Sequence, residues 1–340
     1  MELKVRHLSQ KENEIWDQLV NSSPQGHPFL LSDYLSIWAE NDPEIHLLRL
    51  GCFDNKNNLI GGQAFLHRKK AFRRIEVLLQ NWSYTNTPFF TEHIIHGSPQ
   101  YFLAMQALAD EVKRSFDYFR IICHPSIQDV RPLLEHGWRA APDYAHVWDV
   151  RKIDQLLDEL KTKKRFRQME SVFESLDFGD ERHSGIIEEF VPFYQETAQH
   201  IGYKLRKSWH HIFRATATKM LKQNLIRFYT CRHKNGNLAG AATYVLDPAH
   251  HNAYGWQLAH TPFTHSSGEK DFIPALYFFS IEALSHEVSS IDIAEGLRPS
   301  LYFFKDSLGT RSVPELVVET PNAWFWKMIG NTKKSLFSHH

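Results

Sequence analysis

The sequence predicts two related α/β domains, and three observations support this fold class. The chain has 340 residues, which corresponds to about two domains at roughly 150 residues each. Apolar residues make up 42% and aromatic residues 13%, enough for a sizeable core, which excludes disordered, collagen-like and coiled-coil proteins. One succession of predicted elements also occurs twice along the chain, and such an internal repeat decides the fold class.

The repeated unit begins with a β-hairpin signature. Residues 51–66 and 230–245 each contain an apolar run, a turn rich in Asn, Lys or Gly, and a second apolar run, the pattern of a hairpin. Aligned without a gap, the two segments share Cys52/Cys231, Asn58/Asn237, Leu59/Leu238 and Gly61/Gly240. Four identities are weak evidence alone, so the repeat depends on the order of the elements that follow.

The order after each hairpin is helix, strand, short helix and strand. The residue periodicity predicts these elements in the first copy at 98–116, 117–125, 129–137 and 144–150. It predicts their counterparts in the second copy at 274–288, 290–296, 300–309 and 313–319. Gly137 and Gly309 follow the two short helices, each with a proline five residues later. This is the pattern of a left-handed helix cap followed by a new segment.

Further helices precede each hairpin and mark the domain boundary. Apolar stripes predict helices near 11–23, 32–41, 186–201 and 208–223. Residues 151–176 carry two apolar stripes separated by the polar run 161–165, which predicts two helices or one bent connector. We therefore expect an N-terminal domain over 1–150 and a C-terminal domain over 151–338.

Charge and composition exclude several classes of protein. Lys+Arg and Asp+Glu both number 39, so no global field attracts nucleic acid or an anionic membrane. The N-terminus has no apolar signal region, and no stretch reaches the roughly 20 apolar residues of a membrane span. The three cysteines are far apart and imply no disulfide framework. We expect a cytoplasmic protein; the sequence leaves its oligomeric state open.

This order of elements resembles the GNAT acyltransferase fold, and its duplication resembles the FemAB-like tandem-GNAT transferases. The resemblance lies in the segments 27–38, 129–150, 161–170 and 237–309. It implies two tandem GNAT-like domains, each a mixed, mostly antiparallel sheet flanked by helices. It also implies an N-acyltransferase that moves an activated acyl or aminoacyl group onto the amine of a small molecule or precursor. Acyl-CoA or aminoacyl-tRNA would be the co-substrate, tRNA a possible partner, and no cofactor would be bound permanently.

Two alternatives to this function stay open. Acetyl-CoA enzymes of this fold hold the pyrophosphate with a loop of the pattern Arg/Gln-x-x-Gly-x-Gly/Ala at a helix N-terminus. The corresponding segment 261–276 has a single glycine, Glu269 and Pro274, and segment 93–102 again has one glycine. An acyl-CoA-dependent N-acetyltransferase would therefore need an atypical pyrophosphate loop. The other alternative is a non-catalytic binding protein that has kept the fold.

Three residues are candidates for the chemistry of transfer. The resemblance places Lys305, after Phe303 and Phe304, near the acyl-transfer centre, where a cation would stabilise an oxyanion or a donor phosphate. Its alternative role is a surface lysine beside core aromatics. Asp292 and Glu295 end a predicted strand, where ligands gather in α/β sheets, and either would orient or deprotonate the acceptor amine. Otherwise Asp292 is a strand-edge residue and Glu295 caps a turn.

Further candidates concern substrate binding. A basic run predicts contacts with donor phosphates through Lys161, Lys163, Lys164, Arg165 and Arg167. The same run is also typical of a solvated helix face, partly neutralised by nearby glutamates. Aromatic side chains predict an acceptor groove, or else core packing, at Trp82, Tyr84, Trp256 and Phe304. The 21 histidines show no ligand spacing, so no metal is predicted. No motif for covalent catalysis is present.

Overall fold

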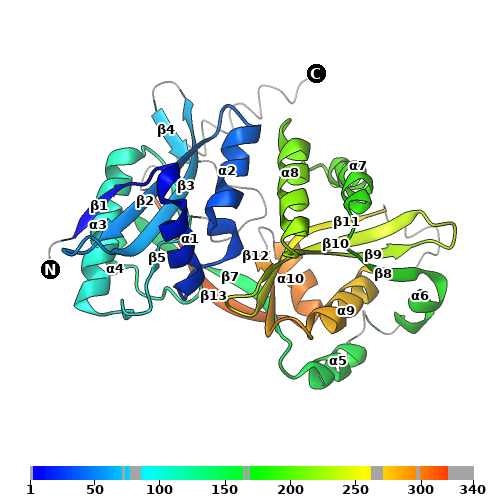
Figure 1. The fold of residues 1–340 in the computed structure, drawn as a ribbon. Helices are drawn as coiled ribbons and strands as arrows, with labels where there is room; N and C mark the ends of the chain where they lie inside the picture. The colour runs from blue at the N-terminus through cyan, green and yellow to red at the C-terminus, as the bar shows by residue number, and fades with distance from the viewer. Residues whose placement is uncertain are drawn as a thin grey trace, which may run out of the picture. The chain divides into compact units, whose positions relative to one another are not determined.

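The computed structural model describes residues 3–70, 73–76, 86–163, 166, 169–261, 271–295 and 299–320. The chain divides into two compact units (Figure 1). Unit 1 comprises Met1–Asp143 and Pro314–His340, and unit 2 comprises Tyr144–Val313. Both contain helices and mostly antiparallel strands, as the sequence predicts.

Unit 1 is built on an antiparallel sheet with the strand order β1-β2-β3-β4. The strands are β1 (Lys4–His7), β2 (His46–Phe53), β3 (Leu59–Lys70) and β4 (Arg73–Glu76), and β5 (Phe89–Phe90) also pairs with β3. The helices are α1 (Asn13–Ser22), α2 (Ser32–Asn41), α3 (Pro99–Ser115) and α4 (Arg131–Leu134), with short 3-10 helices at Gln10–Glu12 and Pro28–Leu30. The predicted apolar stripe of α3 lies in the core, where Met105, Leu108 and Val112 are fully buried.

Unit 2 contains strands in the order β7-β12-β11-β10-β9-β8. Their bounds are β7 (Arg139–Asp149, in unit 2 from Tyr144), β12 (Ser290–Glu295), β11 (Asn252–His260), β10 (Leu238–Asp247), β9 (Ile226–Arg232) and β8 (Asp177–Glu181). Helices α7 (Ser184–His200) and α8 (Trp209–Lys222) cover one face (Figure 1). The other face carries α5 (Ile153–Thr162), α6 (Met169–Ser175) and α9 (Ile273–Leu284). Helix α10 (Pro299–Ser307) follows β12.

The two predicted hairpins are present and pair alike. Cys52 lies opposite Gly61 in unit 1, and Cys231 lies opposite Gly240 in unit 2. In each hairpin the register shifts next to this pair, which places a β-bulge at the same position of both copies. An aromatic ring also lies against each glycine: an added Cβ would come within 2.6 Å of a ring atom of Phe90 or Phe272. The sequence repeat is therefore a structural repeat.

The connector between the copies forms two helices, α5 and α6, one of the two predicted arrangements. Helix α5 ends at Thr162, and Lys163 occupies its C-cap. The two apolar stripes of the connector face the core of unit 2, where Leu160, Phe166 and Val172 are buried.

The closing strand of each copy pairs outside its predicted domain. Residues 147–149 of β7 pair antiparallel with Ser290–Asp292 of β12, within unit 2. Residues 317–319 of β13 (Arg311–Glu319) pair with β6 (Arg120–Ile122), within unit 1. The compact units thus differ from the predicted domains 1–150 and 151–338 in these two segments. The sequence repeat gives the order of the elements along the chain. It does not give the strand with which the closing strand of each copy pairs.

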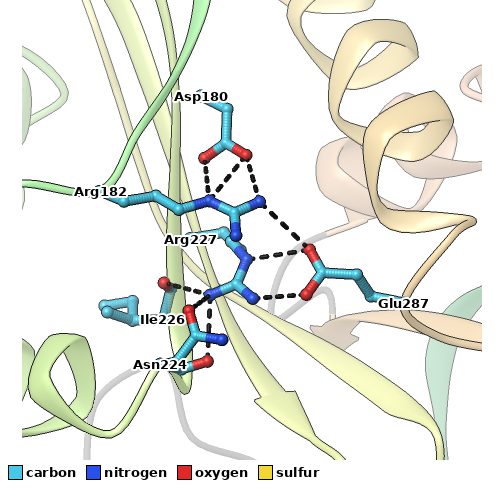
Figure 2. A network of polar contacts seen from close by, with 6 residues as sticks. All are labelled: Asp180, Arg182, Asn224, Ile226, Arg227 and Glu287. Carbon is cyan, nitrogen blue, oxygen red and sulfur yellow. Dashed lines mark hydrogen bonds and ion pairs between the residues drawn. The ribbon is translucent and has the colours of Figure 1, made fainter.

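A buried arginine connects β9 to the turn that follows α9 (Figure 2). The side chain of Arg227 is 1% exposed and donates through Nε and Nη2 to the two carboxylate oxygens of Glu287. Its Nη1 donates to Asn224 and to the carbonyl of Ile226 at 3.0 Å. Arg182 also lies 3.5 Å from Glu287. These bonds satisfy a cation that would otherwise be costly to bury.

The glycines that end the two short helices give a matched test of packing. Gly309 and Gly137 have φ values of +78° and +79°, as predicted for left-handed caps. A Cβ on Gly309 would lie 2.6 Å from Leu160 Cδ2, whereas a Cβ on Gly137 would meet nothing within 4 Å. Gly137→Ala should therefore cost about 1 kcal/mol from backbone strain alone, and Gly309→Ala about 2 kcal/mol because overpacking is added. Chemical denaturation of both variants measures the difference, and equal losses would contradict the packing at Gly309.

Candidate functional site

The strands β11 and β12 separate in the middle of the unit 2 sheet. Their parallel pairing joins Asn252–Tyr254 to Ser290–Asp292 and goes no further in the described residues. Strand β11 continues to His260 alongside β10. At the point of separation, a Cβ on Gly255 would lie 3.3 Å from Ile293 Cγ2. Glycine here lets the two backbones approach closely before they diverge.

A β-bulge in β11 lies at the same point. Thr243 pairs with Gln257 and Tyr244 pairs with Gly255, so β11 contains one extra residue, Trp256, between these two pairs. The Thr243 hydroxyl accepts a hydrogen bond from the Gln257 N–H at 2.9 Å and donates to the Gln257 carbonyl at 3.3 Å. A bulge bends its strand and increases the local twist. The bulge therefore accounts for the divergence of β11 from β12.

The divergence exposes one main-chain edge of β11. The Thr261 N–H donates to the Ala239 carbonyl, and since main-chain groups alternate in direction along a strand, those of Leu258 and His260 point away from β10. The Thr197 hydroxyl, on α7, donates to the His260 carbonyl and accepts from its N–H, both at 3.0 Å. The described strands offer Leu258 no ladder partner on this side. We call the N–H and carbonyl of Leu258 the open edge.

Lys305 lies beside this region as a buried residue. Its side chain is 9% exposed, and its ammonium donates to the Ile293 carbonyl of β12 at 2.7 Å. That carbonyl is available because β12 bulges against β7 between Asp292 and Glu295. The alternative role as a surface lysine is therefore wrong. Lys305 joins α10 to β12 where β12 leaves β11.

The buried contact of Lys305 predicts a loss of stability when the ammonium is removed. Lys305→Met should lower the free energy of unfolding by about 1–2 kcal/mol, because the Ile293 carbonyl loses its donor in a buried position. Phe303, on the same helix, is 77% exposed, so Phe303→Ala should change stability by less than about 0.5 kcal/mol. Thermal or urea denaturation compares the two. A Lys305→Met variant as stable as Phe303→Ala would contradict the contact.

Asp292 precedes Ile293 and is partly buried. It pairs with Tyr254 through the backbone. The pKa of Tyr254 is raised well above its ordinary value, first by burial and then by the carboxylates of Asp247 and Asp292, so the phenol stays protonated. The structure thus places Asp292 directly before Ile293, the β12 residue whose carbonyl accepts the hydrogen bond of Lys305 from α10. Glu295 pairs with Ala145 through its backbone, and its side chain lies outside the described residues.

The predicted donor-binding run is described in part. Lys161 and Lys163 are exposed, and Lys161 Nζ lies 3.5 Å from a carboxylate oxygen of Asp158. Phe166 within the run is buried. The remaining predicted residues, Lys164, Arg165 and Arg167, lie outside the described residues.

Two of the four predicted acceptor aromatics, Trp256 and Phe304, lie within the described residues. Trp256 is 6% exposed and stacks on Phe213 of α8, with ring centroids 4.5 Å apart. Phe304 is half-buried and packs against the core cluster that contains α9. In these contacts the two side chains pack with different helices, and the acceptor groove stays a prediction. Trp82 and Tyr84 lie outside the described residues.

In unit 1, the strand that corresponds to β12 is β6 (Arg120–Ile122), and the Asn86 side chain bonds one edge of it. The side-chain amide of Asn86 donates to the Arg120 carbonyl and accepts from the Ile122 N–H, as a neighbouring strand would. Gln63 of β3 donates to the Asn86 carbonyl at 2.9 Å. Strand β6, the counterpart of β12, therefore has main-chain groups of Arg120 and Ile122 bonded by Asn86.

Other kinds of site find little support in the described residues. Burial raises the pKa of the thiols of Cys52, Cys123 and Cys231 to about 12, so they are poor nucleophiles. No group of three or more His, Cys, Asp or Glu side chains suited to a metal ion occurs in the part of the chain described. No helix there has the length and apolarity needed to cross a bilayer.

The open edge, the bulge and the role of Thr197 do not follow from the sequence pattern. One local signal was present, because a glycine inside a strand, here in Tyr254-Gly255-Trp256, indicates a bulge or a close backbone approach. The positions of Thr197 and Leu258 depend on strand register and on helix packing, which a single sequence does not show.

Similarity to known proteins lies in the fold. No protein-family model matches the chain, and no curated protein matches it in sequence. Among solved structures it is similar to FemX, with a TM-score of 0.64 and 11% identity over 96% of this chain and 99% of that one. It is also similar to a tandem GNAT protein from the clavulanic acid biosynthesis pathway, with a TM-score of 0.55 and 12% identity over 94% and 98%. L-PGS from Bacillus licheniformis matches with a TM-score of 0.53 and 9% identity over 90% of each chain. The predicted FemAB-like tandem-GNAT fold is confirmed.

Proposed function

We propose that the chain is a transferase that moves an activated acyl or aminoacyl group onto an amine acceptor, with the donor bound at the open edge of unit 2. The observation that carries this proposal is the divergence of β11 from β12, which leaves the N–H of Leu258 facing away from β10. The proposal is in keeping with the transferases among proteins of the same fold.

The open edge suits an acyl donor for two physical reasons. An extended, amide-containing arm can add to an unpaired strand edge through main-chain hydrogen bonds. A backbone N–H fixed in a sheet is also the kind of donor that stabilises an oxyanion, because it needs no reorganisation during the reaction. The Leu258 N–H would thus bind the oxygen of the reacting carbonyl. Lys305 would hold α10 and β12 beside it through the Ile293 carbonyl.

The reaction needs one proton transfer. The acceptor amine attacks the acyl carbon, the C–S bond of a thioester or the C–O bond of an ester breaks, and the proton lost by the amine passes to the leaving group. Asp292 is the proposed proton acceptor, because it is a partly buried carboxylate next to Ile293. Glu295 is the second residue predicted for the same role. The basic run is proposed to contact phosphates of the donor. A cytoplasmic location stays a prediction.

Donor binding and product formation test the proposal together. Purified protein is titrated with acetyl-CoA, a long-chain acyl-CoA and an aminoacyl-tRNA at one fixed salt concentration, because phosphate-driven affinities depend on salt. Each donor is then incubated with a panel of primary amines, and acylated products are detected by mass spectrometry. We expect one donor class to bind and to give an amide product. A protein that binds no donor and forms no product would contradict the proposal.

A non-catalytic binding protein is the second candidate. The observation that favours it is the departure of segment 261–276 from the glycine-rich pyrophosphate pattern. Saturable donor binding without product, across the whole amine panel, would support this candidate. An amide product formed from acyl-CoA would instead identify an N-acetyltransferase-like enzyme with an atypical loop.

A further inference from the structure

A separate groove lies within unit 2, where β7 ends and α5 begins. It has a volume of about 660 Å³ and is open to solvent. Its lining comes from the end of β7, from one side of α5 and from the turn that leads into β13, and it includes Arg151, Lys152, Leu156 and Arg311. Pockets of roughly 300–1,000 Å³ hold small organic molecules, so this groove has room for more than a single ion.

Three cations line the groove, and one of them is held in place. The Arg151 guanidinium makes a two-point contact with Asp149, through Nε at 2.8 Å and through Nη2. Arg151 is the main reason that the pKa of Asp149 is lowered to about 2. The Arg151 side chain is still 68% exposed. Its planar fork is therefore fixed from one side and accessible from the other, which suits an oxyanion ligand.

The other two cations make no direct contact with a carboxylate of the described part of the chain, although Arg311 also contributes to the lowered pKa of Asp149 through its charge. Among the described residues, the side chains of Lys152 and Arg311 form no hydrogen bond and no ion pair. Both residues are exposed. A fourth cation, Lys163 of the basic run, is adjacent, because its Cε lies 4.0 Å from the Cβ position of Gly309, which lines the groove.

Two carboxylates also line the groove, and one of them is already hydrogen-bonded to Arg151. Both oxygens of Asp149 are bound by Arg151. Glu159 lines the groove and accepts a hydrogen bond from Gln155 at 3.0 Å. Three lining cations against two lining carboxylates leave the groove net positive, and Lys163 adds to this. Leu156, which is half-buried against the core of unit 2, supplies an apolar wall.

We propose that this groove binds a small organic phosphate that carries two or more negative charges, with its phosphate between Arg311 and Lys152 and its body against Leu156. A single carboxylate would neutralise one cation and leave the other unpaired, whereas a phosphate dianion or pyrophosphate matches both and accepts bonds from the Arg151 fork as well. The inference stands apart from the proposed transferase, because it concerns equilibrium binding and requires no reaction.

Calorimetric titration with inorganic pyrophosphate tests the groove at one fixed, low salt concentration. We expect saturable one-to-one binding to the full chain. The double variant Lys152→Gln/Arg311→Gln should bind at least about tenfold more weakly, because two charge-assisted contacts are lost. The matched control is Lys204→Gln/Lys207→Gln, which removes two exposed charges elsewhere in unit 2 and should change the affinity by less than about twofold.

Glu159→Gln is a second variant, and its expected change in pyrophosphate affinity has the opposite sign. Removing the opposing charge should tighten pyrophosphate binding by about two- to fivefold. The proposal is overturned if the full chain shows no saturable binding, or if the groove and control double variants lose affinity equally. It is also overturned if an RNA hairpin binds more tightly than pyrophosphate and loses affinity in the groove variant, because the groove is then part of a nucleic-acid surface. None of these outcomes depends on acyl transfer, so failure here is distinguishable from failure of the proposed function.

Discussion

Replacement of Leu258 by proline is expected to lower the rate of acyl transfer by about 10²–10³-fold, the loss typical of removing one oxyanion donor. Proline lacks the N–H that the account places against the reacting carbonyl. This N–H points away from β10, so its removal breaks no hydrogen bond of the β10–β11 ladder. Proline is tolerated at strand positions of this kind. The measurement is kcat/KM for the donor and amine pair found in the assay above.

Leu258→Ala is the matched control for the proline variant. Alanine removes the same side chain but keeps the N–H, so the rate should stay within about tenfold of the unaltered protein. Circular dichroism and urea unfolding show whether both variants remain folded. Equal rates for the proline and alanine variants would show that the N–H is not an oxyanion donor.

Glu287→Ala is expected to have the largest effect on stability, a loss of about 3 kcal/mol. The Arg227 side chain is 1% exposed, and removal of Glu287 leaves a buried cation with only neutral partners, which costs about 3–5 kcal/mol for fully buried pairs. The lower end applies because the Glu287 side chain is 29% exposed. Glu282 on α9 is an exposed control, and Glu282→Ala should cost less than about 0.5 kcal/mol.

The same pair predicts a pH dependence. The pKa of Glu287 is lowered, chiefly by its hydrogen bonds with Arg227. A carboxyl whose pKa is lower in the folded state stabilises the protein above its unfolded pKa of about 4.3. That contribution disappears as the pH falls through the folded pKa. The stability difference between the unaltered protein and Glu287→Ala should therefore be full at pH 7 and shrink below about pH 4. A difference that stays constant over this range would contradict the ion pair.

The local elements were predictable because their signals are short-range. The turn of the first hairpin is fixed by Asp54, whose carboxylate accepts from the N–H groups of Lys56 and Asn58, and by Asn57 with φ +63°. Helix α3 follows its predicted apolar stripe and begins at Ser98, which accepts a hydrogen bond from the Tyr101 N–H. Such contacts span a few residues, so the sequence pattern contains them.

The site was predictable only in part because it depends on distant segments. The sequence pattern identifies Lys305 and Asp292 as candidates. The same pattern fits a surface lysine at position 305, because the burial of Lys305 depends on its contact with a β12 carbonyl. The pairing of β7 with β12 and of β13 with β6 is set by the tertiary fold. The open edge results from the strand register around Gly255. A glycine within a strand indicates a bulge or a close backbone approach, but it does not show which residues of β10 and β12 lie opposite.

The most direct test of the account is amide hydrogen exchange at Leu258, with and without the donor that the binding assay identifies. Fast exchange is expected at Leu258 in the free protein, because its N–H lies on the open edge, and slow exchange at His260, whose N–H donates to Thr197. Donor binding should protect Leu258 strongly and leave His260 unchanged. If a donor binds with full affinity while Leu258 stays unprotected, the donor does not lie at the open edge and the central claim is wrong.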